Sequence, residues 1–285
     1  MVVMRFDLVT IGTATRDVFL RSDSFFILED KKHAPGGKAE CFPLGAKIDI
    51  GEPVFTIGGG AANAAITGAR QGLKTAAVFS VGNDESGETI IEVLKEEGVK
   101  IYPEIHDNLG TAYSTIMLQE NGERTVLVYR GASEEMSYDD LFFGSLKTKW
   151  VYITPGGLPF GVISNAIKTA RKNGAKVAIN PSSHYIKTGK NFLREIMTMI
   201  DVVIMNREEA AEFTGVAQDD EAGIFKAFDG LVLGLAVMTD GRNGVSVSDG
   251  KILHHAGVFK EKQIADRTGA GDAFGSGFVA ALING

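Results

Sequence analysis

Short apolar runs recur along the chain, and each ends at a glycine or at a small polar residue. The runs cover residues 8–11, 77–81, 150–153, 177–179, 202–205 and 235–238. Strands that are buried on both faces of a parallel sheet are apolar in this nearly continuous way. The pattern therefore predicts a mostly parallel central sheet.

The segments between these runs carry the period of an α-helix. Ile163, Ala166, Ile167 and Ala170 lie at positions i, i+3, i+4 and i+7, and residues 173–174 (Asn-Gly) supply a stop signal. Alternation of strands with such helices favours an α/β fold with helices on both faces of the sheet.

Two regions, residues 13–57 and 104–133, lack helical periodicity. In the second, the β-rich runs 113–118 and 125–129 flank residues 121–122 (Asn-Gly), which predicts a β-hairpin. We expect the two regions to form a small β-sheet lid on one domain that spans the whole chain. Within the first region, the glycine- and lysine-containing stretch 31–47 is expected to be a surface loop.

Composition narrows the partners and the compartment. The chain has 285 residues, 44% of them hydrophobic and 23% charged, with a formal net charge of −7. We therefore expect a globular protein with no nucleic-acid or membrane partner. Cys41 is the only cysteine, which fits a reducing cytoplasm, and Arg5 and Asp7 interrupt the first apolar run, unlike a signal peptide.

Glycine is unusually frequent: there are 35 glycines in the chain, well above the average usage of about 7%. Gly269, Ala270 and Gly271 come directly before a predicted helix that starts at Asp272. A helix N-terminus exposes unpaired N–H groups, and small residues let a phosphate approach them. A carboxylate beside that phosphate has a clear task if it accepts a proton from an attacking hydroxyl.

This stretch also has two simpler interpretations. Asp272 could be only an acidic residue in the first turn of a helix, where carboxylates are favoured. Residues 275–280 also fit a loose dinucleotide-binding pattern, but no βαβ unit follows them, so a dehydrogenase is remote. The sequence lacks the P-loop motif as well.

Residues 266–272 (Asp-Arg-Thr-Gly-Ala-Gly-Asp) resemble the D-T-x-G-A-G-D signature of the ribokinase-like, or PfkB, family of carbohydrate and nucleoside kinases. Residues 57–65 resemble the N-terminal glycine motif of the same family, in the right order along the chain. The resemblance runs from about residue 6 to the end. It implies a three-layer ribokinase-like fold with a β lid, and an ATP-dependent kinase that uses Mg²⁺.

The resemblance also implies roles for individual residues. Those that bind the acceptor would be Asp17, Gly58, Gly59 and Asn63. Those on the nucleotide side would be Asn180, Thr239, Gly241, Gly244 and Thr268. Gly269, Ala270 and Gly271 would hold the transferred phosphate, and Asp272 would be the base.

Asn206 and Glu209 match the N-x-x-E motif that organises magnesium through water in the family. Their spacing is equally typical of a capping box, with Asn at the N-cap and Glu at N3. The family usually continues for some tens of residues beyond its last motif helix and encloses the adenine and a monovalent cation there. Since this chain stops at Gly285, we expect either a truncated end or a different base pocket.

The acceptor stays open between a sugar and a nucleoside. We favour a hydroxymethyl group of a sugar, because no aromatic residue of the first lid segment is obviously placed to stack on a base. Arg16 and Arg130 could bind an acidic group on the sugar, or could be ordinary surface residues. A non-catalytic sugar or nucleotide sensor on the same fold is a further alternative. Exposed lid edges also predict a homodimer through the lid.

Overall fold

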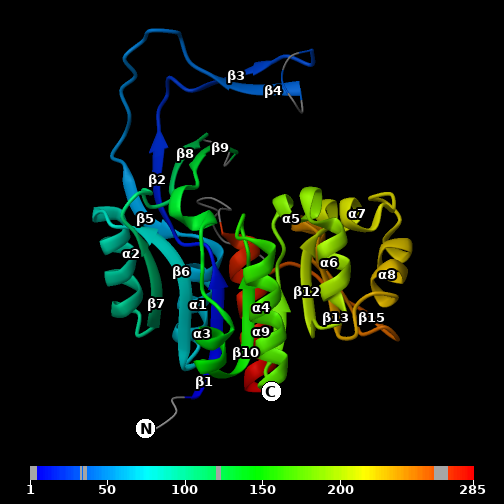
Figure 1. Cartoon of the computed structure of the whole chain (residues 1–285). Helices are drawn as coiled ribbons and strands as arrows, with labels where there is room; N and C mark the ends of the chain where they lie inside the picture. The colour runs from blue at the N-terminus through cyan, green and yellow to red at the C-terminus, as the bar shows by residue number, and fades with distance from the viewer. Residues whose placement is uncertain (1–4, 33, 35–36, 120–122, 260–268) are drawn as a thin grey trace.

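The computed structural model describes residues 5–32, 34, 37–119, 123–259 and 269–285. A large sheet with helices on both sides forms the body of the molecule, and a small sheet stands at one end of it (Figure 1). The first helix, α1 (Gly60–Arg70), follows the small sheet's first strands, and the last, α9 (Ala270–Asn284), packs beside it. Both matter for the site below.

The large sheet has nine strands among the described residues, in the order β15-β14-β13-β12-β11-β10-β1-β6-β7. Strands β13, β12, β11, β10, β1, β6 and β7 are parallel, and β14 and β15 add an antiparallel edge. Their bounds are β1 Arg5–Gly12, β6 Thr75–Gly82, β7 Lys100–His106, β10 Lys147–Thr154, β11 Lys176–Ile179, β12 Val202–Asn206, β13 Leu235–Thr239, β14 Val245–Ser248 and β15 Leu253–Ala256. The predicted parallel sheet is confirmed.

Alternate side chains of each central strand enter different layers. In β10, Val151 and Ile153 join the core under α3 to α8, whereas Trp150 and Tyr152 join the core under α1 and α9. The other helices are α2 Glu85–Glu96, α3 Asp140–Ser145, α4 Phe160–Lys172, α5 Ser183–Thr188, α6 Lys190–Met197, α7 Arg207–Thr214 and α8 Glu221–Asp229. The predicted three-layer α/β architecture is thus confirmed.

The best-marked helix behaves as its sequence predicts. The buried residues of α4 are Ile163, Ala166, Ile167 and Ala170, the four positions of the apolar stripe. Asn173 caps the C-terminal end and Gly174 follows with φ +78°. Only a glycine adopts that left-handed conformation cheaply, which explains why the helix stops there.

The small sheet has the strand order β5-β2-β8-β9, and we call it the lid. Its strands are β2 Thr15–Arg21, β5 Val54–Gly58, β8 Tyr113–Leu118 and β9 Arg124–Tyr129. The hairpin predicted from residues 113–129 is present as the antiparallel pair β8–β9, although its Asn-Gly turn lies outside the described residues. Strand β2 pairs antiparallel with β5 but parallel with β8.

A second hairpin extends beyond the lid. Strands β3 (Phe26–Glu29) and β4 (Lys38–Cys41) form a separate two-stranded antiparallel sheet, which projects away from the body (Figure 1). The expectation of a plain surface loop over 31–47 was therefore incomplete, because β4 lies within it. Within the described ranges, no helix is long and apolar enough to cross a membrane.

Candidate active site

The two glycine motifs meet at one hydrogen bond. The Asn63 side chain in α1 donates from Nδ2 to Oδ2 of Asp272 in α9, at 2.9 Å, across 209 positions of sequence. The two helices also pack directly on each other. The fold therefore brings the upstream motif and the C-terminal motif into a single site.

Asp17 reaches the same site from the lid. It lies in β2, is 9% exposed, and accepts a hydrogen bond of 2.9 Å from the Thr15 hydroxyl. A Cβ atom on Gly58 would come within 2.0 Å of an Asp17 carboxylate oxygen, so only glycine leaves room for this side chain. The negative charge of Asp17 in turn acts on Asp272.

A tight turn sets the start of α1. Gly59 is the N-cap with φ +91°, and Thr13 holds the turn from the end of β1. The Thr13 hydroxyl accepts from the Gly60 N–H at 3.1 Å, and its carbonyl accepts from the Ala61 N–H at 3.0 Å. Gly58, Gly59 and Asn63 are thereby fixed beside Asp17.

The last helix starts two residues earlier than the sequence indicates. We expected it to begin at Asp272, but α9 begins at Ala270, with Gly269 as N-cap at φ +75°. No side chain of the described residues caps this end. Its first N–H groups therefore point outward with the partial positive charge of a helix N-terminus, beside Asp272 in the first turn.

Burial sets the acidity of Asp272. Removal from water raises its pKa above the ordinary value, and the nearby charge of Asp17 adds to that rise. The hydrogen bond from Asn63 acts in the opposite direction and lowers the pKa. A carboxylate with a raised pKa is a better proton acceptor than an exposed one, as a general base requires.

The residues predicted to contact the nucleotide lie at or just after the ends of β11 and β13 in the large sheet. Asn180 directly follows β11 and donates to the Ile204 carbonyl at 2.7 Å, while Thr239 ends β13. Gly241 and Gly244 bound a short turn after β13, and a Cβ on Gly244 would lie 2.1 Å from the Ala256 carbonyl oxygen. Thr268 lies outside the described residues.

Asn206 and Glu209 form the capping box that the sequence left as an alternative. The Asn206 side chain accepts from the Glu209 N–H at 2.8 Å, and the Glu209 carboxylate accepts from the Asn206 N–H at 3.0 Å. Burial raises the pKa of Glu209. The capping box uses one carboxylate oxygen of Glu209, Oε2. It therefore does not test the role in magnesium binding, which stays a prediction.

A family model described as pfkB family carbohydrate kinase matches residues 6–285. The chain belongs to this family. It is therefore an ATP-dependent phosphotransferase with an alcohol group as acceptor, and the predicted kinase activity is confirmed.

Similar proteins include both sugar and nucleoside kinases. The chain is 30% identical over 245 residues to a ribokinase of Haemophilus influenzae, covering 79% of this chain and 74% of that protein. It is 30% identical over 241 residues to a cytidine kinase of Thermococcus kodakarensis, covering 82% and 83%. The structure of an adenosine kinase from Sinorhizobium meliloti superposes with a TM-score of 0.80 at 25% identity, covering 98% and 88%.

Several residues of this kinase site were missed in the sequence. Thr13 fixes the turn before α1, and Thr15 orients the Asp17 carboxylate. The only sequence feature that could have indicated these roles is the run of small residues after β1. Thr154 and Tyr152, at the end of β10, have buried hydroxyl oxygens without a hydrogen-bond partner among the described residues. Nothing in the sequence distinguished them from ordinary strand residues.

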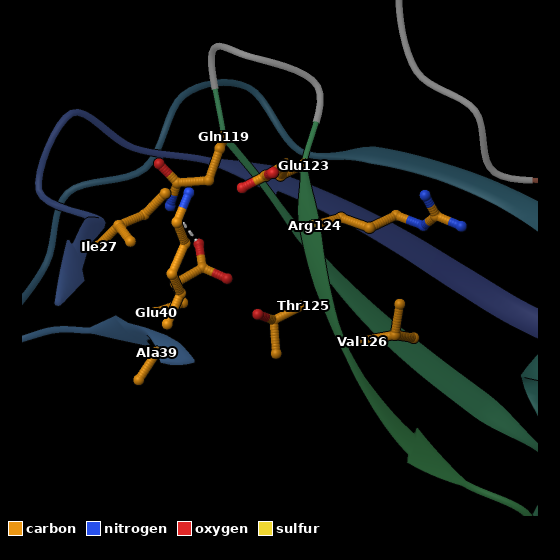
Figure 2. Close-up of a pocket in the computed structure, with 9 residues that line it drawn as sticks. Ile27, Ala39, Glu40, Gln119, Glu123, Arg124, Thr125 and Val126 are labelled. Atoms are coloured by element: carbon orange, nitrogen blue, oxygen red, sulfur yellow. Dashed lines mark hydrogen bonds between the residues drawn. The ribbon is translucent and has the colours of Figure 1, made fainter. Parts of the chain in front are cut away.

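A groove elsewhere on the kinase lies where the β3–β4 hairpin crosses the lid. Figure 2 shows it between Ile27 and Glu40 of the hairpin and Gln119, Thr125 and Val126 of the lid. The Gln119 amide donates to the Glu40 carboxylate and joins the two sheets. None of the residues that line this groove is one of the predicted site residues, so we assign it no catalytic role.

The buried charge of Asp272 predicts an effect on stability. Because its pKa is raised in the folded state, the ionised carboxylate destabilises the fold at pH values above that pKa. Asp272→Asn should therefore raise the unfolding temperature near pH 8. The gain should shrink as pH falls through the folded pKa and vanish below the unfolded one.

Asp7→Asn is the matched control of opposite sign. A hydrogen bond from Lys149 and one from the Lys74 backbone lower the pKa of Asp7, so its charge stabilises the fold above the unfolded pKa. That variant should unfold at a lower temperature near pH 8. Thermal unfolding curves from pH 3 to pH 8 compare the two, and a less stable Asp272→Asn protein at pH 8 would contradict the prediction.

Proposed function

We propose that this kinase transfers the γ-phosphate of ATP to a hydroxymethyl group of a sugar, with Asp272 as the general base. The hydrogen bond between Asn63 and Asp272 is the observation that supports this proposal best. It joins the acceptor-side motif to the phosphate-side motif. A hydroxyl bound beside Asn63 therefore lies within reach of the carboxylate that would take its proton.

Asp17, Gly58, Gly59 and Asn63 form the acceptor side of the proposal. The Thr15 hydroxyl fixes one oxygen of Asp17 at 2.9 Å, which orients the carboxylate to accept hydrogen bonds from two adjacent hydroxyls. The Asn63 amide group gives its N–H to Asp272 and keeps its carbonyl oxygen as an acceptor. A neutral polyol suits these groups.

The phosphate side rests on the start of α9. The backbone N–H groups of Gly269, Ala270 and Gly271 are the first of that helix, and no acidic residue other than Asp272 lies in its first turn. Such N–H groups stabilise the charge that develops on a transferred phosphoryl group. Thr268 is assigned to the same phosphates by the resemblance alone.

The chemistry of this chain is then a proton transfer and charge stabilisation. As the acceptor oxygen attacks phosphorus, its proton passes to a carboxylate oxygen of Asp272, while the bond between phosphorus and the leaving ADP oxygen breaks. The lid covers the acceptor and keeps water from competing as the attacking group.

The nucleotide would lie along the strand ends that carry Asn180, Thr239, Gly241 and Gly244. A Cβ on Gly241 would meet no atom of the described residues within 4 Å, so the turn after β13 is open on that side. An open glycine turn gives a flat nucleotide base or ribose a close approach to backbone. Any monovalent cation would be a further cofactor of this region.

Magnesium would neutralise the phosphates. Among the described residues, no group of three or more His, Cys, Asp or Glu side chains is placed to hold a metal ion. Mg²⁺ commonly keeps several waters and binds to one or two carboxylates together with substrate phosphates. Glu209 and Asn206 fit that mode, since both present oxygen atoms at the end of β12.

We further propose a homodimer through the lid. Phe55 lies opposite Val18, Val18 opposite Thr115, and Thr115 opposite Leu127, so these four share the lid face opposite to Asp17. Phe55 and Leu127, on the two edge strands, are 55% and 56% exposed, whereas Val18 between them is buried. Exposed apolar side chains on edge strands favour pairing with a second copy.

A cytoplasmic location is the compartment we propose. Cys41 carries a free thiol among the described residues, and reducing conditions keep such a thiol intact. ATP, the proposed phosphate donor, is also available in that compartment.

The acceptor class can be tested by measuring ADP release. The screen uses free hexoses, pentoses, 2-keto-3-deoxy acids, phosphosugars and nucleosides with the wild type and with Asp17→Ala, Asp272→Asn and the exposed control Asp23→Ala. We expect turnover with a sugar. Asp272→Asn should reduce it by roughly 10²–10⁴-fold, and loss of hydrogen bonds to a charged group in Asp17→Ala should reduce it by roughly 10–150-fold.

The outcomes separate the possibilities. Asp23→Ala should match the wild type, because its side chain is exposed and away from the turn at Gly58. Turnover with nucleosides alone would replace the sugar by a nucleoside. Near-normal turnover of Asp272→Asn with its best acceptor would remove Asp272 as the base.

The metal role of Glu209 predicts a shift in magnesium requirement. Glu209→Gln keeps an oxygen that can accept from the Asn206 N–H, so the capping box and the unfolding temperature should change little. The magnesium concentration for half-maximal rate should rise several-fold, because a charged partner of the metal's water shell is lost. Glu208→Gln, on the exposed side of the same helix turn, is the control. An unchanged magnesium requirement with a lower unfolding temperature would leave Glu209 as a cap only.

The dimer is tested by light scattering at micromolar concentrations. Leu127→Glu places a charge on the lid face opposite to Asp17 and should convert dimers to monomers. Leu233→Glu, at a position that is 81% exposed and outside the lid, should leave the dimer intact. A monomeric wild-type protein, with or without acceptor, would refute the dimer and leave the kinase assignment untouched.

A further inference from the structure

Tyr152 carries a buried hydroxyl that nothing in the described structure uses. Its side chain is 0% exposed, and its oxygen has no hydrogen-bond partner among the described residues. Buried polar atoms almost always have a partner, because an unpaired one costs about 1–3 kcal/mol. Tyr185 gives the comparison: it is equally buried, yet its hydroxyl donates to the Leu158 carbonyl at 2.5 Å.

The Tyr152 hydroxyl lies directly under the first turns of α9. A Cβ atom on Gly275 would come within 2.4 Å of the Tyr152 oxygen. Gly275 is three positions after Asp272 and therefore lies on the same side of the helix. The glycine leaves the space that the hydroxyl occupies, on the side of the helix that carries the catalytic carboxylate.

Electrostatics links the two groups. Burial raises the pKa of Tyr152 far above its ordinary value, and the charge of Asp272 raises it further. The phenol therefore stays protonated at every pH at which the enzyme works, and it can only act as a neutral donor when it faces a carboxylate.

Asp272 has few partners for its charge. Among the described residues, Asp17 from β2 repels the charge of Asp272 and the neutral amide of Asn63 from α1 stabilises it, while that charge in turn acts on Tyr152 from β10. Asn63 binds one carboxylate oxygen, Oδ2. The ionised carboxylate thus has acceptor capacity left, and the buried phenol has a proton to donate.

We propose that Tyr152 is a positioning residue for Asp272, whose hydroxyl donates a hydrogen bond to the carboxylate directly or through one buried water when the site closes. This inference rests on the proposed role of Asp272 as the base. With Asn63 on one side and Tyr152 on the other, the carboxylate is held in the orientation that receives the acceptor's proton. Tyr152 touches no reactant and acts through Asp272.

The test compares Tyr152→Phe with the matched variant Tyr185→Phe. Loss of a donor disfavours the ionised carboxylate, so Tyr152→Phe should raise the pKa of Asp272. The acidic limb of the kcat profile, which reports the enzyme with its substrates bound, should then move to higher pH, and kcat should fall about tenfold, with KM for ATP unchanged. Carbon-13 NMR of the Asp272 carboxyl in the protein bound to acceptor and a non-transferable ATP analogue should report the same upward pKa shift without reference to activity.

Tyr185→Phe should behave in the opposite way. It leaves the buried Leu158 carbonyl without its partner, so the unfolding temperature should fall while the acidic limb stays in place. Tyr152→Phe removes a hydroxyl without a partner in the resting structure, so its unfolding temperature should not fall. An unmoved acidic limb and an unmoved Asp272 pKa in Tyr152→Phe would overturn the proposal.

A second pair of variants tests the placement of the hydroxyl. Gly275→Ala introduces the Cβ that would meet the Tyr152 oxygen and should lower both kcat and the unfolding temperature. Adding Tyr152→Phe removes that oxygen, so the double variant should be more stable than Gly275→Ala alone. Additive effects on stability would contradict the contact.

Asp272→Asn separates this inference from the proposed function. If Asp272→Asn keeps near-normal turnover, Asp272 is not the base and the proposed function fails first. If Asp272→Asn is inactive and Tyr152→Phe has wild-type profiles, only the role of Tyr152 is lost.

Discussion

The site depends on one constraint: a carboxylate must stay ionised, buried and correctly oriented beside the place where a phosphate is bound. Water cannot supply that support, so the protein must. The hydrogen bond from Asn63 to Asp272 supplies part of it and ties α1 to α9. Both helices lie on the same face of the sheet, and the core between them is built from Leu8, Tyr152 and Ile204 among others. Packing of that layer therefore sets the distance between Asn63 and Asp272.

Two helix starts offset the negative charge of this site. Gly59 and Gly269 are the N-caps; Thr13 accepts from the first N–H groups of α1, whereas no side chain of the described residues caps α9. The partial positive charge of these helix ends acts on the site without a buried cation. That arrangement suits phosphoryl transfer, in which the charge to be stabilised is large before and after the step. Glycine is needed at both caps because each has a positive φ.

The sequence predicted the elements whose signals are local. Strand runs such as 150–153 and the stripe of α4 repeat a period that burial alone explains, and the glycine motifs identified Asp272 and Asn63. The contacts of Tyr152 were not predictable, because whether its hydroxyl finds a partner depends on which helix packs above β10. The spacing of Asn206 and Glu209 fits a cap and a metal site equally well, and the capping box becomes visible only in the folded chain. The β3–β4 hairpin was missed because its strands are short and exposed.

In the proposed mechanism, the lid links binding of the acceptor to the assembly of the base. Asp17 lies on a lid strand, whereas Asp272 lies on a helix of the body, and the two carboxylates repel each other. An acceptor with adjacent hydroxyls, as we propose, would donate hydrogen bonds to both and so screen that repulsion. The lid position that places Asp17 close to Asp272 would therefore be less costly with acceptor bound than without it. In this proposal the groups that recognise the acceptor favour closure only when there is a hydroxyl to phosphorylate, which would limit transfer of phosphate to water.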